Sequence, residues 1–178
     1  LKGSLIIGNN LSQEGVTVVQ HDLAGQQLYG IGSIVSNGPT SVFTAAGSLQ
    51  AFSESQNSFS AFSGPNLSDG VGYFFTPSSN VKLEIEGEPI VSLPSTALSY
   101  TTGTSLSTAG WNFTANPFTS SFNVNKGLEL TNADKAVYAW SNGRYFVWNG
   151  TTGSLANGII PSGAAFFVKA TSTSGQMT

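Results

Sequence analysis

The chain has 178 residues, no cysteine and a formal net charge of −3, and only 8% of its residues are charged. With 39% hydrophobic residues and 21 glycines, the composition excludes a disordered chain, which needs low hydrophobicity or high net charge. The six Lys and Arg residues form no basic stripe, which argues against a nucleic-acid partner, and no apolar run approaches the ~20 residues of a membrane-spanning helix.

Short apolar runs alternate with polar residues at a period of two along the chain, and Gly, Asn, Ser and Pro separate them. This pattern is typical of a β-sandwich or barrel, so we predict an all-β, sandwich-like fold. Up to residue 101 the predicted strands are Ser4–Ile7, Val16–His21, Leu28–Val35, Leu49–Phe52, Phe59–Phe62, Val71–Thr76, Val81–Glu86, Ile90–Leu93 and Leu98–Thr101. The single helical candidate is Lys126–Lys135, which could equally be a loop.

The order of these patterns occurs twice, over residues 30–77 and 110–170. Each copy opens with a Gly-led strand that runs to a Pro (GIGSIVSNGP and GWNFTANP) and continues to an aromatic hairpin (LQAFSESQNSFSAFSG and VYAWSNGRYFVWNG). Each closes with a Gly and an apolar run (GVGYFFTP and GAAFFVKA). Repetition on this scale indicates one structural unit built twice. We therefore predict a single module over residues 1–170, made of two diverged repeats with antiparallel hairpins, and a tail or linker over residues 171–178.

The sharpest local prediction is a hairpin around Asn142-Gly143, between two aromatic runs. A type I′ turn needs a positive φ at both central positions, which Asn-Gly provides. The turn predicts the pairs Ser141–Arg144, Trp140–Tyr145, Ala139–Phe146, Tyr138–Val147 and Val137–Trp148. Because side chains alternate across a strand, one face carries Tyr138, Trp140, Tyr145 and Val147, and the other carries Val137, Ala139, Phe146 and Trp148.

Tyr138, Trp140 and Tyr145 are the candidate ligand-binding residues. An aromatic ring has an apolar face that can stack on the C–H face of a sugar, so an exposed set would form a binding platform. The alternative is that these rings fill the space between two layers. The first copy has aromatic Phe52 and Phe59 at the places of Trp140 and Tyr145, which favours this alternative.

No catalytic residue, metal site or cofactor is predicted. His21 is the single histidine, expected at the surface near a strand end, and Asp22 beside it points to the opposite face, so it cannot easily orient His21 for a catalytic triad. Glu84, Glu86 and Glu88 fall on one strand face roughly 7 Å apart, near the spacing of an inverting glycosidase pair. Glycosidase pairs flank a substrate cleft and usually come from different elements, so a solvated strand face of mixed charge that discourages edge pairing is the preferred interpretation.

The segments GSLII, VTVVQ, GVGYFFT, AGWNFTANPF, VYAW, YFVWNG and IIPSGAAFFVKA occur in this order. Their order resembles a β module of large proteins that the type IX secretion system of Bacteroidota exports. The resemblance covers nearly the whole chain and is most specific at residues 110–118 and 159–170. The first copy departs from it, with Ile31 where Trp111 stands in the second. The resemblance implies a place in a long secreted or surface protein, such as an enzyme or an adhesin, and transfers no catalytic residue.

These observations predict a non-catalytic, extracellular or cell-surface structural or adhesive β module of a larger protein. A charge-poor, hydroxyl-rich surface suits stacking on other protein modules or on copies of itself, in a fibre or surface layer, and open sheet edges offer the means by strand addition. The alternative is a carbohydrate-binding module, with a polysaccharide partner on the second hairpin. Because the chain starts at Leu1 without an initiator Met or signal peptide, we expect a processed product or part of a longer protein.

Overall fold

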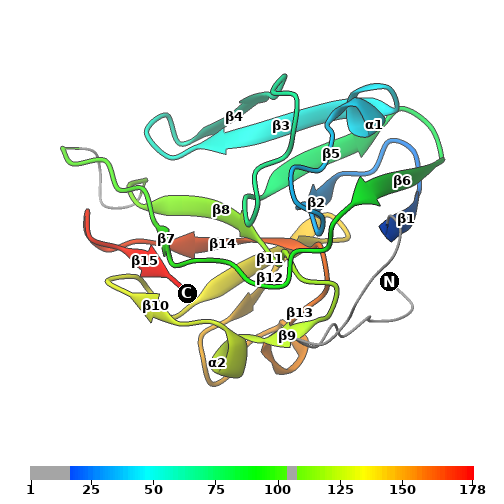
Figure 1. Ribbon diagram of the computed structural model, residues 1–178. Coiled ribbons are helices and arrows are strands. Elements are labelled where there is room, and N and C mark those ends of the chain that lie inside the picture. Colours follow the sequence, from blue (N-terminus) through cyan, green and yellow to red (C-terminus); the bar gives the residue numbers. More distant parts are fainter. Residues whose placement is uncertain (1–16, 104–107) are drawn as a thin grey trace.

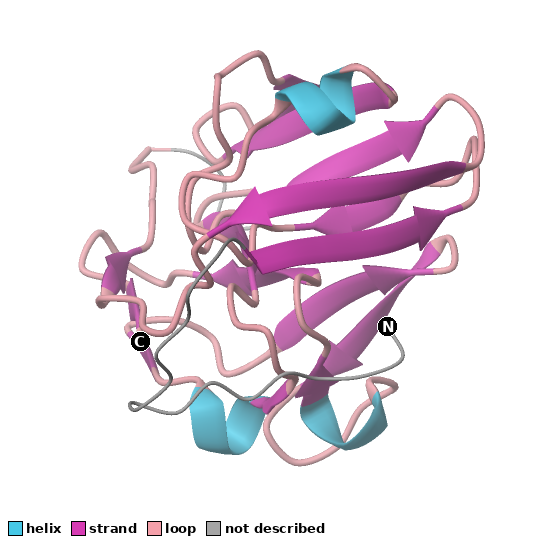
Figure 2. Ribbon diagram, turned by 45° about the vertical axis from the view of Figure 1, so that its right-hand side comes forward, coloured by secondary structure: helices cyan, strands magenta, loops and turns pink. Residues whose placement is uncertain are grey.

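The computed structural model describes residues 17–103 and 108–178, and strands dominate it (Figures 1 and 2). The strands up to residue 97 are β1 (Thr17–Leu23), β2 (Tyr29–Ile31), β3 (Gly47–Ser53), β4 (Ser58–Ala61), β5 (Tyr73–Pro77), β6 (Val81–Gly87) and β7 (Thr96–Ala97). The later strands are β8 (Trp111–Ala115), β9 (Phe122–Asn123), β10 (Leu130–Thr131), β11 (Val137–Ser141), β12 (Arg144–Trp148), β13 (Ile159–Ile160), β14 (Ala165–Lys169) and β15 (Gln176–Met177). The helical elements are α1 (Ser41–Thr44), α2 (Val124–Gly127) and a 3₁₀ turn at Ala156–Gly158. The predicted all-β class is confirmed, and the predicted strand Ser4–Ile7 lies outside the described residues.

Two four-stranded antiparallel sheets form the body of the molecule. The first sheet has the strand order β2-β5-β3-β4, and the second has the order β8-β14-β11-β12. In each sheet a hairpin, β3–β4 or β11–β12, lies at one edge. The strand β5 or β14, which follows the hairpin in the chain, lies between the hairpin and the strand β2 or β8, which precedes it. The two sheets therefore share one strand order. The remaining strands form the β1-β6 pair, the β9-β13 pair and the small sheet β10-β15-β7.

Both predicted hairpins are confirmed. In β11–β12 all five predicted residue pairs occur, and Asn142 and Gly143 have φ values of 50° and 77°, as a type I′ turn requires. In β3–β4, Phe52 lies opposite Phe59. Turn chemistry and side-chain alternation are local properties, which is why the sequence predicts these two elements well.

The two sheets face each other across a set of mostly aromatic side chains, which we call the aromatic layer. Its buried members are Phe74, Phe113, Ala115, Ala165 and Phe167, and half-buried Leu28, Phe52, Phe59, Trp111, Tyr138 and Trp140 pack against them. The rings of Phe113 and Phe167 stack with centroids 4.5 Å apart, and Phe74 of the first sheet lies 4.8 Å from Phe113. Such ring pairs contribute about 0.5–1.5 kcal/mol each beyond the area they bury, so the layer is a major part of what joins the sheets.

The outer face of the first sheet is covered by the β1–β6 pair and by α1, seen at the right and top of Figure 1. Leu83 and Ile85 of β6 are 3% and 2% exposed and pack with Phe43 and Phe75, whose rings meet edge to face at 5.3 Å. The intervening charged residues of β6 are exposed. The predicted alternation along this strand is therefore confirmed.

The outer face of the second sheet is covered by α2, β9, β13 and the end of the chain (Figure 1). Residues 171–178, predicted as a tail or linker, are instead packed on this body. Gln176 and Met177 pair with β7 and β10, and Met177 is 6% exposed. Burial of the Met177 side chain outweighs the linker-like composition around it.

The two sheets also meet at one corner. Isolated bridges pair Ile31 with Ala164 and Val71 with Thr114. A Cβ atom added to Gly32 would lie 2.1 Å from the Cβ of Ala115. The backbones approach this closely because position 32 carries no side chain.

One predicted strand is much shorter in the structure, and two are absent. The predicted strand Leu28–Val35 is reduced to β2, because the chain turns at Ser33, whose Oγ donates a hydrogen bond to the carbonyl of Val35. Neither Ile90–Leu93 nor Leu98–Thr101 forms a strand, and β7 lies between them. Alternation of apolar residues in these short runs reflects contact with the core rather than pairing in a sheet.

The helical candidate Lys126–Lys135 is wrong for most of its length. Helix α2 already ends at Gly127, and the residues from Leu130 form β10, which pairs with β15. The N-cap of helix α2 is Asn123, whose side chain accepts a hydrogen bond from the Asn125 amide. Pairing with a segment more than 40 residues away along the chain overrides the weak local preference for helix.

Strand register also corrects one correspondence between the two sheets. The inner strands pair Phe74 with Gly30 and Phe167 with Phe113. Gly30 and Phe113 therefore lie at corresponding positions of the two sheets. Two residues earlier in the chain, Leu28 in the first sheet corresponds to Trp111 in the second. The expectation that Ile31 takes the place of Trp111 is therefore wrong.

Candidate functional site

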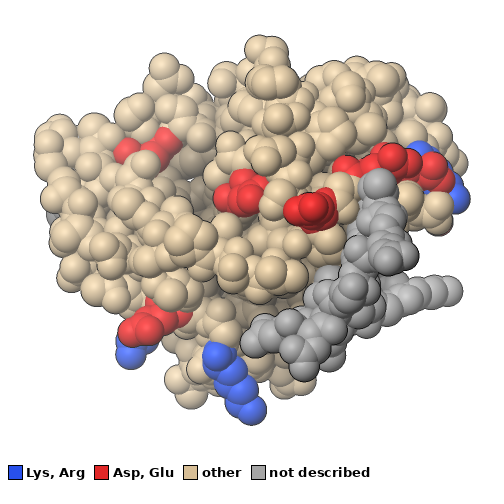
Figure 3. All heavy atoms as spheres, viewed as in Figure 1, with Lys and Arg blue, Asp and Glu red and all other residues tan. Residues whose placement is uncertain are grey.

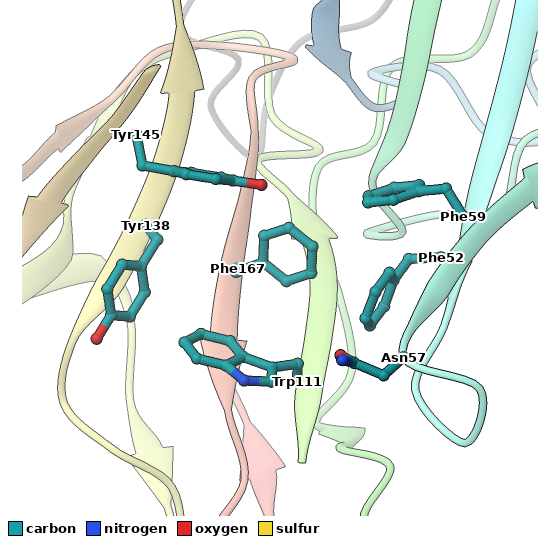
Figure 4. A pocket seen from close by; sticks show the side chains of 7 residues that line it. All are labelled: Phe52, Asn57, Phe59, Trp111, Tyr138, Tyr145 and Phe167. Carbon is teal, nitrogen blue, oxygen red and sulfur yellow. The ribbon is translucent and has the colours of Figure 1, made fainter. Parts of the chain in front are cut away.

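An open cleft with a volume of about 320 Å³ lies between the two hairpins, beside the aromatic layer. It is lined by Phe52, Asn57, Phe59, Trp111, Tyr138, Tyr145 and Phe167. Figure 4 shows the side chains of the β3–β4 hairpin on one side, the two tyrosines on the other, and Phe167 and Trp111 between them. We call this recess the aromatic cleft. Its volume is at the lower end of the range of about 300–1,000 Å³ for small-ligand sites.

Two of the three predicted ligand-binding residues line the cleft, and the third, Trp140, does not. Tyr145 is 44% exposed, and its hydroxyl points towards the centre of the cleft (Figure 4). Tyr138 is half-buried, with its ring edge-on to Trp111 at 5.2 Å and its hydroxyl directed away from the centre (Figure 4). Trp140 does not line the cleft, because it packs between the sheets and its Nε1 donates a hydrogen bond to the Leu28 carbonyl at 3.2 Å.

Five lining residues are not among the predicted ligand-binding residues: Phe52, Asn57, Phe59, Trp111 and Phe167. The signal that could have found two of them is the alternation of the first hairpin, which places Phe52 and Phe59 on one face. The sequence pattern does not indicate that the aromatic faces of the two hairpins meet. That contact depends on the packing of two sheets whose strands lie far apart along the chain.

The tip of the first hairpin is tied to the chain that leads into Trp111. The Glu54 carboxylate accepts hydrogen bonds from the amide and hydroxyl of Thr101, at 3.0 and 2.6 Å, and from the amide of Gly110 at 2.7 Å. Partial burial opposes ionisation of this carboxyl, but the three hydrogen bonds outweigh it and hold the pKa of Glu54 below its ordinary value. Asn57, at the same tip, has a φ of 46°. The three hydrogen bonds of Glu54 hold the β3–β4 hairpin, which forms one side of the cleft, in place against the second sheet.

The chemistry of the cleft suits binding. Of the described residues that line it, none is His, Asp, Glu, Lys or Arg. Burial raises the pKa of Tyr145, so its hydroxyl remains protonated at neutral pH and can donate a hydrogen bond. The carboxamide of Asn57 offers both a donor and an acceptor. Aromatic faces with a few uncharged polar groups can hold a neutral ring, whereas the carboxylate and imidazole groups of most acid–base catalysts are missing from this lining.

The acidic residues of β6 lie on a solvated face away from the cleft. Glu84 accepts a hydrogen bond from Gln20 at 2.8 Å and lies 3.3 Å from the Lys82 ammonium, with about half of each charged side chain exposed. Most of the face shown in Figure 3 carries no charge, and its acidic groups are scattered.

Across residues 17–103 and 108–178, no cluster of three or more His, Asp or Glu could hold a metal ion. No helix in the same ranges has the length and apolar character to cross a membrane.

His21 lies within β1 rather than at its end. It pairs with Leu83 of β6 and is half-buried, on the strand face that carries Val19 and Leu23, which pack on the core. Burial lowers the pKa of His21 below its ordinary value of 6.5. Asp22 pairs with Lys82 and points to the other face, so the expected separation of His21 and Asp22 is observed.

Acidification should destabilise the protein through His21. Because the folded pKa lies below the unfolded one, the unfolded chain takes up a proton first, so stability is full above about pH 6.5 and falls as the pH drops below it. Urea unfolding at intervals between about pH 7.5 and 5.5 measures this slope, and a His21→Gln variant should flatten it. An unchanged slope in the variant would show that other groups cause it.

Comparisons with known proteins found no match for this chain. No protein-family model matches it. No curated protein and no solved structure matches it either. The function of the aromatic cleft must therefore be inferred from its own residues.

Proposed function

We propose that this chain is a non-catalytic structural and adhesive β module of a larger protein that is secreted or displayed on the cell surface. The observation that carries the proposal is the aromatic cleft, a ligand-sized recess whose lining favours binding over acid–base chemistry. Both of its walls rest on the packed aromatic layer. Its partners would be other protein modules or copies of the same chain.

The proposal includes a sandwich-like architecture of two diverged repeats. It is supported by the shared strand order of the two sheets and by aromatic pairs at the same place in both hairpins, Phe52 with Phe59 and Trp140 with Tyr145. Export by type IX secretion is part of the same proposal. It is supported by the motifs AGWNFTANPF and IIPSGAAFFVKA, whose strands β8 and β14 are paired neighbours.

Strand β4 offers an edge for assembly. Among the described strands it pairs only with β3, and Ser60 and Ala61 are exposed. The amide of Phe62 donates to the Leu49 carbonyl at 2.9 Å, so alternation along the strand turns the Ser60 amide towards β3 and the Ala61 amide outward. Outward backbone groups can pair with a strand of a neighbouring molecule.

An Ala61→Pro substitution tests the assembly. Proline removes the outward amide and leaves the bonds to β3, so self-association should weaken about tenfold, which corresponds to ~1.4 kcal/mol. Analytical ultracentrifugation over a concentration series measures the effect. The matched Ser60→Pro variant breaks a bond to β3 and should lower the melting temperature as well. A native chain that is monomeric at every concentration and adheres to no surface would contradict the proposal.

A carbohydrate-binding module is the second candidate function. The observation that favours it is the position of the Tyr145 hydroxyl and the Asn57 carboxamide beside ring faces in an open cleft (Figure 4). A sugar could place its C–H face on the rings and direct its hydroxyls to these groups and to water. A neutral glycan fits better than an acidic one, because no cationic side chain is among the described lining residues.

A further inference from the structure

Strand register relates the aromatic cleft to a second place in the molecule. Five residues of the second sheet have a counterpart at the corresponding position of the first sheet. With the residue of the second sheet given first, the pairs are Trp140/Phe52, Tyr145/Phe59, Tyr138/Gln50, Phe167/Phe74 and Trp111/Leu28. Phe52, Phe59, Phe167 and Trp111 all line the cleft. Their counterparts are Trp140, Tyr145, Phe74 and Leu28. We call the place that Tyr145, Phe74 and Leu28 form around Trp140 the counterpart site, and Tyr145 also lines the cleft.

The counterpart site is occupied by a side chain of the protein itself. The indole of Trp140 lies 5.8 Å from the ring of Phe74 and 4.9 Å from that of Tyr145. Its Nε1 donates a hydrogen bond to the Leu28 carbonyl at 3.2 Å. A flat ring with one N–H donor therefore fits between the sheets at this place.

In the cleft, Phe52 is seated as Trp140 is in the counterpart site. Its ring lies 5.0 Å from Phe167 and 5.0 Å from Phe59. Phenylalanine lacks the second ring and the N–H group of tryptophan. Because phenylalanine is the smaller side chain, Phe52 fills less of the space between the sheets than the indole of Trp140 does in the counterpart site.

We propose that the aromatic cleft receives an aromatic side chain, preferentially an indole, from a partner protein, an inference that rests on the adhesive function proposed above. The seated Trp140 shows that such a ring is compatible with this arrangement of neighbours. The lining matches a neutral, largely apolar occupant, because it holds six aromatic side chains and no ionised group among its described residues. Edge-to-face and stacked ring contacts stabilise such an occupant, and the side-chain carbonyl of Asn57 can accept a hydrogen bond from the indole N–H.

Titration with a short peptide, acetyl-Gly-Trp-Gly-amide, tests the occupant. NMR signals of the Asn57 side-chain amide and the Tyr145 ring should shift, with a dissociation constant around the millimolar range expected for one buried side chain. The matched peptide acetyl-Gly-Ala-Gly-amide should leave them unchanged. Absence of any shift with the Trp peptide would overturn the inference.

A Phe52→Trp variant should close the cleft with the protein's own indole and weaken peptide binding at least about tenfold. The control is Phe62→Trp, which adds the same ring to the same hairpin on the opposite face, where Phe62 packs with Tyr73, and should bind as the native chain does. Tyr145→Ala, at a partly exposed position, provides a second variant that should also bind at least about tenfold more weakly. Native-like binding by both Phe52→Trp and Tyr145→Ala would overturn the inference.

Neutral oligosaccharides such as cellohexaose complete the experiment. If they shift the Asn57 and Tyr145 signals and the Trp peptide does not, the cleft is a carbohydrate site and the aromatic occupant is wrong. If the Trp peptide does not bind but the native chain still self-associates, this inference is wrong and the proposed assembly through β4 stands.

Discussion

Replacing Asn116 with alanine should destabilise the protein by about 3–5 kcal/mol, a large part of the usual stability of a domain. Asn116 is fully buried, and its Nδ2 donates to the carbonyls of Ser120, Ile160 and Pro161 at 2.9, 3.2 and 3.0 Å. Its Oδ1 accepts from the amide of Phe118 at 3.0 Å. Alanine would leave four backbone groups without these partners, in a turn over residues 116–120 that is buried or half-buried. Urea unfolding monitored by tryptophan fluorescence measures the change.

Two further variants separate the hydrogen bonds from other effects. Asn116→Asp keeps the shape but loses the donors and places a charge opposite three carbonyls, so at neutral pH it should cost at least as much as alanine. The control is Asn149→Ala, at an exposed turn where the side chain accepts from the amides of Thr151 and Thr152, and it should cost less than about 1 kcal/mol. Equal losses at positions 116 and 149 would contradict the assigned role of the buried amide.

Replacing Gly110 with alanine should cost at least about 3 kcal/mol or prevent folding. Gly110 has a φ of 82°, and an added Cβ would lie 2.1 Å from the backbone carbonyl oxygen of Ala170. Its own carbonyl accepts a hydrogen bond from the Ala170 amide at 2.7 Å, and its amide donates to Glu54. The backbone therefore cannot move aside without breaking contacts to both Ala170 and the first hairpin. Thermal unfolding followed by circular dichroism measures the loss.

Gly143→Ala is the matched control for this prediction. Gly143 has a similar φ of 77°, and an added Cβ there would meet no atom within 4 Å. It should therefore cost only the strain of the left-handed conformation, about 1–2 kcal/mol. The difference between the two variants measures the steric contact at Ala170. If both variants lose the same stability, the close approach at position 110 carries no energetic weight.

The most accurate predictions from the sequence concern β11–β12 and β6. The Asn142-Gly143 turn determines the register of its hairpin, and register determines which side chains share a face. Strand β6 follows the same rule, with buried Leu83 and Ile85 between exposed charges. Predictions failed where a short pattern had to compete with distant contacts, as in the Lys126–Lys135 segment and in the chain end that forms β15.

The candidate site was predictable only in part. Alternation places Tyr138, Trp140 and Tyr145 on one face, but it does not distinguish an exposed ring from one that packs between sheets. In the structure Tyr138 and Tyr145 line the cleft, whereas Trp140 belongs to the aromatic layer and does not line the cleft. Asn57 could not be identified from a pattern, because it reaches the cleft from the tip of the other hairpin.

By itself, the sequence determined the all-β class, the two hairpins and the faces of their strands, because turn chemistry and alternation act between residues close together in the chain. The tertiary structure decided which faces meet, where the short edge strands end and where a cleft remains. These features depend on contacts between distant segments, such as the hydrogen bond that joins Trp140 to Leu28, 112 residues away. The aromatic cleft is lined by residues of two hairpins that belong to different sheets, so it exists only once the sheets face each other.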